Sequence, residues 1–219
     1  MQLRKKESKN INKSRKSQLL VIGSLLLIIG GAGILGFRYY QSYRDNKVEQ
    51  KEIEEFIDIQ RDVITSGTID PSKEVEEEQP KQQVETDYIA VLEIPKINLR
   101  KGIYAKDSSK NNVNKNIELM KESNMPDEVN GNFILAGHSG TSRVSYFKNL
   151  HKLENGDLAY IYYNGSRLVY KLVNSYDIQK TGEASIARNG QKTTLTLITC
   201  RHNTDKQTIF IFELMEDGA

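Results

Sequence analysis

The residue of this 219-residue chain best suited to nucleophilic chemistry is its single cysteine, Cys200. It ends the run TLTLITC, whose alternation predicts a β-strand that carries the thiol at its open end. Without a second cysteine the thiol cannot form an intramolecular disulfide, so it is either a buried filler or a reactive group. Arg201 follows directly, and a nearby cation favours the thiolate, which is the nucleophilic form. The position at a strand end therefore favours a reactive thiol.

A thiol nucleophile normally works with a histidine, and the chain has three, His138, His151 and His202. His138 follows the apolar run NFILAG and stands among glycine and serine, which predicts a second strand end that opens onto a loop. His151 lies in SYFKNLHKL, a pattern that predicts the surface of a short helix. His202 is two residues from Cys200, and neighbours that close along a chain rarely reach each other well. His138 is therefore the candidate partner of the thiol.

The N-terminal region predicts a membrane anchor. Residues 19–37 carry no charge, and a helix of that length is about as long as a hydrocarbon core is thick. Residues 1–17 hold seven Lys or Arg and one Glu, so the positive-inside rule predicts a cytoplasmic basic tail. A cleaved signal peptide is the alternative, but its apolar centre usually has about 7–15 residues. We therefore predict a single-pass anchor in the cell membrane, with the rest of the chain extracellular.

The next segment, 38–87, is predicted to be a helical stalk and an acidic linker. Residues 46–64 space their apolar side chains at near-helical intervals among charges. Residues 66–87 hold seven acidic residues against two lysines and few apolar ones, so they cannot bury enough surface to fold. The formal net charge of the whole chain is only +2, which gives no indication of a nucleic-acid partner.

Residues 88–219 have the texture of a mainly β domain, because short apolar runs alternate with turn signals. Asn164-Gly165 predicts a tight hairpin. Brief helical patterns occur at 117–123 and 145–153. Six or more strands among few helices predict a compact β-barrel or sandwich. The six predicted strands are 88–94, 132–137, 158–163, 167–178, 193–199 and 208–215.

Several motifs of this region, in this order, resemble those of the sortase family. They are IAVLEIPKINL (89–99), LAGHSG (135–140), YFKNLHKLENGD (146–157) and TLTLITC (194–200). Sortases are membrane-anchored cysteine transpeptidases of Gram-positive bacteria. The resemblance covers 88–219 and implies that this region is the catalytic domain, an eight-stranded sortase-type β-barrel with short helices. It also implies that His138 and Cys200 are the catalytic pair.

The resemblance implies the reaction and its partners as well. It predicts that Cys200 attacks the Thr–Gly bond of an LPXTG-like sorting signal at the C-terminus of a surface protein, with His138 as general acid. The resulting thioester is then expected to pass to an amine of a cell-wall precursor, while membrane lipid surrounds the anchor. We expect no cofactor and no obligatory metal, since Glu183 is the lone acid in the loop where a calcium site belongs.

One position departs from the family pattern. In the strand after the cysteine, DKQTIFIFEL, Gln207 stands where sortases supply an arginine that stabilises the oxyanion or holds the substrate backbone. An amide offers one neutral hydrogen bond where a guanidinium offers a charged fork. Gln207 is the first candidate for the oxyanion and substrate-binding group, and Arg201 is the second. Arg143 can also substitute, and for both arginines a solvated loop cation is the competing interpretation.

Three other functions compete with this hypothesis. A cysteine endopeptidase uses the same pair and passes its acyl group to water. A binding module keeps the fold but has lost turnover together with the arginine. A metal site built from Cys200, His202 and His138 lacks a fourth ligand and the usual closely spaced pairs.

Overall fold

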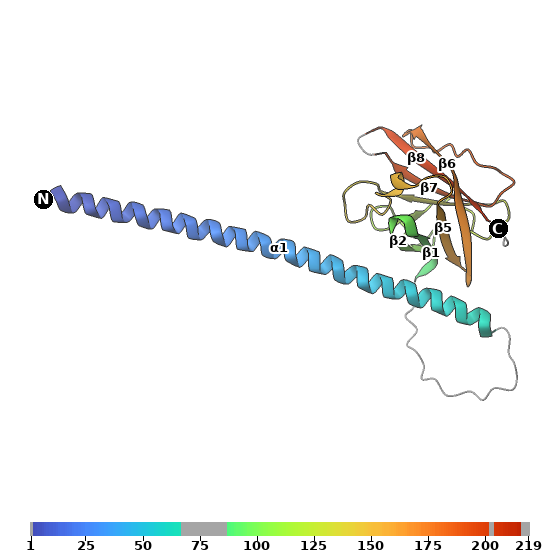
Figure 1. The fold of residues 1–219 in the computed structure, drawn as a ribbon, viewed down its shortest axis with the longest axis horizontal. Coiled ribbons are helices and arrows are strands. Elements are labelled where there is room, and N and C mark those ends of the chain that lie inside the picture. The colour runs from blue at the N-terminus through green and yellow to red at the C-terminus, as the bar shows by residue number, and fades with distance from the viewer. Residues whose placement is uncertain (1, 67–86, 202–203, 216–219) are drawn as a thin grey trace, which may run out of the picture. The chain divides into compact units, whose positions relative to one another are not determined.

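The computed structural model describes residues 2–66, 87–201 and 204–215, and for the first helix it describes the side chains of residues 23–59 and 61. The chain divides into two compact units, Met1–Glu49 and Gln50–Ala219. Figure 1 shows the helix α1, which spans Gln2–Ser66, and the strands of the second unit. The acidic spacer predicted over 66–87 lies almost entirely outside the described residues.

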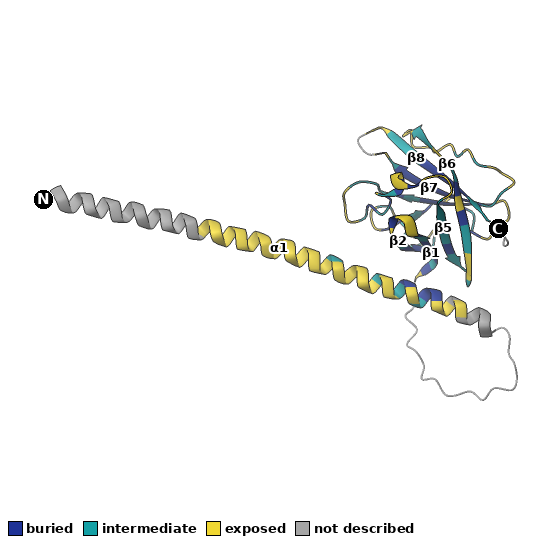
Figure 2. Cartoon of the chain, viewed as in Figure 1, coloured by how far each residue is buried: buried dark blue, intermediate teal, exposed yellow. Residues whose placement is uncertain are grey.

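Helix α1 is continuous through the segments predicted as tail, anchor and stalk. Among the described residues it supplies one stretch, Gly23–Ile59, whose length and hydropathy suit a membrane span. The large apolar side chains between Leu25 and Phe37 are exposed (Figure 2), which is the arrangement that contact with lipid requires. One N-terminal apolar helix is therefore available as an anchor.

The described part of the second unit contains eight strands that form one nearly closed, barrel-like sheet in the order β2-β1-β5-β6-β8-β7-β4-β3. Neighbouring strands are antiparallel except β4 and β7, which are parallel. The side-chain amide of Asn116 donates to the Gly102 carbonyl at 2.7 Å and ties the two ends of the sheet together. The eight-stranded, nearly closed sheet confirms the predicted fold class. The strands are β1 Tyr88–Ile94, β2 Leu99–Tyr104, β3 Glu118–Leu119, β4 Asn132–Gly137, β5 Leu158–Tyr163, β6 Ser166–Gln179, β7 Thr194–Cys200 and β8 Lys206–Leu214.

The two short helical predictions need correction. Residues 117–123 do not form a helix: Glu118–Leu119 is a strand, because the sheet offers β4 as a partner and the barrel core buries Leu119. Within 145–153 only Leu150–Lys152 is helical, as the 3-10 helix η2; a second one, η1, spans Pro95–Ile97. Strand β2 was not predicted, because Arg100 and Lys101 interrupt its apolar pattern.

The predicted hairpin is confirmed between β5 and β6. Tyr163 pairs with Ser166, and the two residues between them have left-handed backbones, with φ of 46° at Asn164 and 74° at Gly165. Asparagine and glycine tolerate positive φ better than other residues, so this dipeptide forms the tight turn at little cost.

Strand β7 is buried on both faces, and this divides the core into two layers. Leu195 and Leu197 point into the barrel, where they join Phe133 and Phe210. Ile198 lies on the outer face in a second cluster, which includes Ile134, Ile209 and Ile211 of the neighbouring strands. A strand in this position needs apolar residues on both faces, which explains the nearly unbroken run TLTLIT.

The C-terminal part of α1 belongs to the same compact unit as the barrel and covers β1 from outside. Ile53, Phe56 and Ile57 are buried against Tyr88 and Val91. The rings of Phe56 and Tyr88 meet edge to face with centroids 6.4 Å apart, and the Tyr88 hydroxyl donates to Glu52 at 3.3 Å. The segment predicted to be a stalk thus packs against the barrel.

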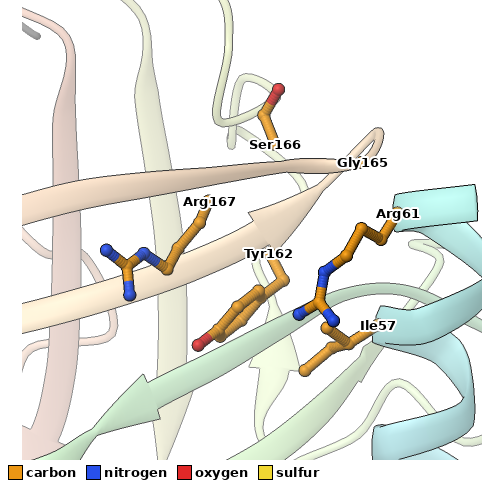
Figure 3. Close-up of a pocket in the computed structure, with 6 residues that line it drawn as sticks. All are labelled: Ile57, Arg61, Tyr162, Gly165, Ser166 and Arg167. Carbon is orange, nitrogen blue, oxygen red and sulfur yellow. The ribbon is translucent and has the colours of Figure 1, made fainter. Parts of the chain in front are cut away.

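A small pocket of about 250 Å³ remains where α1 meets the β5–β6 hairpin. Figure 3 shows Ile57 and Arg61 reaching from α1 toward Tyr162, whereas Arg167 and Ser166 point away from the helix. The two guanidinium groups do not converge, so the pocket is a packing gap and offers no shared anion site.

This contact predicts different stabilities for two fragments. A fragment that begins at Asp87 should fold, because the barrel core is intact, but its free energy of unfolding should be about 2–4 kcal/mol lower than that of a fragment beginning at Gln50. In the longer fragment, Phe56→Ala should reproduce much of that loss, whereas Ile59→Ala should change it by less than about 0.5 kcal/mol because Ile59 is exposed. Urea denaturation of the four proteins measures these differences. Equal stability of the two fragments would show that the helix contact contributes nothing.

Candidate active site

The parallel pairing of β4 and β7 places the two predicted catalytic residues on neighbouring strand ends. Gly137 is the register partner of Thr199, so His138 and Cys200 come next on their strands. The Thr199 hydroxyl donates to the Gly137 carbonyl at 2.7 Å, and the Ser139 hydroxyl donates to the Cys200 carbonyl. Both His138 and Cys200 are half-buried. Side-chain hydrogen bonds therefore hold the two strand ends in register.

A buried polar group fixes the same register at the other end of the strand pair. The side-chain carbonyl of Asn132 accepts from the hydroxyls of Thr194 at 3.0 Å and Thr196 at 2.8 Å. All three side chains are buried, and a one-residue slip would leave them unpaired. This explains why β7 carries threonines on a face that is otherwise apolar.

The loop after His138 is tied back to the strand. The Phe147 amide donates to the His138 carbonyl at 3.0 Å, and the Phe147 ring lies so close to Gly137 that an added Cβ would be 2.8 Å from it. Glycine before the histidine is therefore required by packing. Next to Phe147, the ring of Tyr146 has the buried Lys101 ammonium 3.9 Å from its centroid.

The imidazole of His138 has a partner that sequence reasoning missed. Its Nε2 lies 3.3 Å from the side-chain oxygen of Asn114, in the segment between β2 and β3. The donor and acceptor roles in this contact depend on the imidazole tautomer: with the amide oxygen as acceptor, Nε2 carries the proton. Asn114 is 24 residues from His138, and the local sequence holds no signal that links the two.

The two tentative oxyanion groups occupy different faces of the sheet. Cys200 and Gln207 are register partners on β7 and β8, so their side chains share the face that carries Ile198 and Ile209. Arg201 is ion-paired with Asp177 of β6, whose register partner Thr208 lies on the opposite face. Gln207 is thus the one placed beside the thiol. Arg143 is exposed in the loop after His138.

Cys200 lies between a pocket and an apolar surface. The pocket, of about 850 Å³, is lined by both polar and apolar residues, among them Ser139, Phe147, His151, Leu153, Asp177, Thr199, Cys200, Arg201 and Phe210. On the other face, Ile198 and Ile209 form a surface onto which Ile186 of the β6–β7 connection packs. The Tyr176 hydroxyl accepts from the Ala187 amide at 2.6 Å and holds this connection in place.

The remaining predicted residues are less closely tied to the thiol. His151 is exposed on η2, with Nδ1 2.9 Å from the Lys148 carbonyl, and is one of the residues that line the pocket beside Cys200. His202 lies outside the described residues. Among the residues that the structure does describe, no three His, Cys, Asp or Glu side chains group together in a way that could hold a metal ion.

The fold is a nearly closed β-barrel, and the site places a thiol and an imidazole on adjacent strand ends. Together they define a class of protein that is suited to acyl transfer through the thiol. A family model described as the sortase domain matches residues 92–213, more than half of the chain. The chain therefore belongs to the sortase family and is a cysteine transpeptidase.

Individual relatives agree with this assignment. Sortase A of Bacillus anthracis is 24% identical over 189 residues, which cover 84% of this chain and 88% of that protein. The solved structure of a Clostridium perfringens sortase D5 transpeptidase is 26% identical, with a TM-score of 0.55, and the match covers 78% of this chain and 99% of that one. Sortase C1 of GBS pilus island 1 shares the fold at 21% identity and a TM-score of 0.52, over 59% of this chain and 65% of that chain.

Proposed function

We propose that this enzyme cleaves an LPXTG-like sorting signal through a thioester on Cys200 and joins the surface protein to an amine of the cell wall. Sortases act on surface proteins that carry such signals, and the family assignment supports this substrate class. The observation that carries the proposal is the parallel β4–β7 pair, with His138 and Cys200 next to each other at its end.

The proposed reaction has two acyl transfers. The Cys200 thiolate attacks the Thr–Gly carbonyl, and collapse of the tetrahedral intermediate breaks the C–N bond while His138 gives its proton to the leaving amine. The acceptor amine then attacks the thioester, passes a proton back to His138 and releases the thiolate. The contact between Nε2 and Asn114 supports this role of His138 by orienting the imidazole at the end of β4.

The surroundings of Cys200 suggest where the sorting signal lies. Its Leu and Pro are apolar. On the thiol's own face of the sheet Ile198 and Ile209 are buried, and the half-buried Ile178 and Ile186 that pack against them leave an apolar surface partly open. An extended peptide on this surface would bring the bond after its threonine to Cys200. Burial of the two apolar side chains would contribute the binding free energy.

Gln207 is our candidate for the side-chain donor to the oxyanion, shared with backbone N–H groups. Gln207→Ala should slow acylation by a factor that corresponds to about 2.7–4 kcal/mol, because one preorganised donor is lost. Gln207→Arg should acylate at the parent rate or faster. Pre-steady-state acylation rates measure both, and the same measurement on Arg201→Ala, Lys206→Ala and Arg143→Ala ranks the other candidates. Acylation at the parent rate by all four alanine variants would assign the oxyanion to the backbone alone.

The proposed location follows from α1. The apolar stretch of this helix anchors the enzyme in the cell membrane, in contact with lipid. The basic residues before it keep the N-terminus in the cytoplasm, which puts the barrel outside, where surface proteins and the wall meet.

The decisive experiment is a search for the acyl adduct. The enzyme is incubated with peptides that contain LPXTG-like signals, with and without an amine acceptor. Mass spectrometry then follows the formation and loss of an acyl adduct on Cys200. An adduct on Cys200 that the amine converts to a ligated product supports transpeptidation. An adduct that water resolves equally well with the amine present indicates an endopeptidase, and failure of every peptide to form an adduct favours a binding module.

A further inference from the structure

A polar row crosses three strands just below the nucleophile. Asp177 of β6 is the register partner of Thr208 of β8, and Thr208 is the partner of Thr199 of β7. The Thr208 hydroxyl donates to one oxygen of Asp177 at 2.8 Å, and the other oxygen is paired with the guanidinium of Arg201. Asp177 thus links the central strand β8 to the residue that directly follows Cys200.

The ion pair fixes the side chain of Arg201 on one side of the sheet. The Arg201 amide donates to the Lys206 carbonyl at 2.9 Å, and the Arg201 carbonyl accepts from the Thr204 hydroxyl at 3.1 Å. With its backbone held in this turn, the guanidinium reaches back to Asp177, which lines the pocket beside Cys200. The Asp177 side chain is 23% exposed, less than the 55% of Arg201, so the carboxylate is the buried member that anchors the pair.

The consequence concerns the charge that the thiol experiences. Arg201 is adjacent to Cys200, and a guanidinium turned toward the sulfur would strongly favour the thiolate. Strand alternation sends the two side chains to opposite faces, and the Asp177 carboxylate both neutralises the cation and keeps it there. Gln207, the register partner of Cys200 on β8, is then the polar side chain beside the thiol on the same face of the sheet.

We propose that Asp177 is a positioning residue that neutralises Arg201 and holds its guanidinium on the face of Thr199 and Thr208, opposite to the face of the Cys200 side chain. The proposal deepens the proposed function, since it rests on Cys200 being the nucleophile. Through Asp177, strand β6 has a role in the site although we assign no catalytic residue to that strand.

The test uses the lone cysteine as its own probe. Alkylation of Cys200 in the full chain is measured with iodoacetate, which is anionic, and with iodoacetamide, which is neutral and of similar size. The rate with iodoacetate divided by the rate with iodoacetamide rises as the local charge at the sulfur becomes more positive. A general change in exposure or folding affects both rates and cancels from this ratio. Low ionic strength keeps the electrostatic effect visible.

The proposal predicts that substitution of Asp177 changes the ratio of the two alkylation rates more than substitution of Arg201 does. Asp177→Asn should raise the ratio about threefold or more, because the released guanidinium can approach the sulfur. Asp177→Glu should keep the parent ratio, since it restores the carboxylate. Arg201→Gln alone should change the ratio by less than about twofold, because the paired cation acts little on the thiol. The double variant Asp177→Asn/Arg201→Gln should return to the parent value.

Three results would overturn the proposal: an unchanged ratio in Asp177→Asn, a rise that persists in the double variant, or an Arg201→Gln effect as large as that of Asp177→Asn. The last would mean that Arg201 already acts on the thiol while Asp177 is present. Because alkylation needs no sorting peptide, these outcomes are independent of whether the adduct experiment succeeds.

Discussion

Cys200→Ala is expected to abolish both the acyl adduct and the ligated product. The chain has no other thiol, and no neighbouring side chain can form a thioester. The barrel should stay folded, because Cys200 is half-buried at the end of β7 and the strand pairing uses only its backbone. Intact-mass measurement and chromatography of the peptide products check the first expectation, and urea denaturation checks the second.

Cys200→Ser provides the matched control, since it keeps the size and polarity of the side chain but replaces the acidic thiol with a weakly acidic hydroxyl. It should fold like the parent and form no product at a measurable rate. Product from Cys200→Ala at the parent rate would mean that the nucleophile lies elsewhere in the chain. That outcome would remove the basis of the whole site assignment.

The parts of the fold that local patterns determine were predictable. β1, β4 and β5 begin and end where their apolar runs do, and the Asn164-Gly165 turn joins β5 to β6 as its dihedral preferences require. The spanning part of the long helix followed from the uncharged run 19–37 and the stalk part from the near-helical spacing over 46–64, whereas the continuity of α1 from Gln2 to Ser66 was not predicted. These features depend on residues that are close in the sequence, so single-sequence reasoning reaches them.

The parts that depend on distant partners were not predictable. Residues 117–123 have a helical pattern, yet Glu118–Leu119 pairs with β4 because that strand's edge and the core space for Leu119 are available only in the folded barrel. The docking of Phe56 on Tyr88 was hidden in the same way, since it joins segments separated by the acidic linker. Tertiary contacts decide such cases over local propensity.

The site shows the same division. The positions of His138, Cys200 and Gln207 followed from motifs, because each stands at a recognisable point of a strand. The pairing of Arg201 with Asp177 and the contact of His138 with Asn114 each join residues 24 positions apart. No pattern in the sequence marks these pairs. The first pair holds the Arg201 guanidinium on one face of the sheet, and the second orients the His138 imidazole.

His138→Ala is expected to reduce turnover by on the order of a hundredfold or more, because the leaving amine loses its positioned proton donor. The fold should survive, since Phe147 contacts the backbone carbonyl of His138 and not its ring. His151→Ala is the matched control: its imidazole is exposed and lies at hydrogen-bonding distance from the Lys148 carbonyl. That variant should retain most of the parent rate, as should His202→Ala. Steady-state transpeptidation with a sorting peptide and an amine ranks the three variants. If His202→Ala or His151→Ala were as damaging as His138→Ala, the proton donor would have to be reassigned, although the β4–β7 register places His138 next to Cys200.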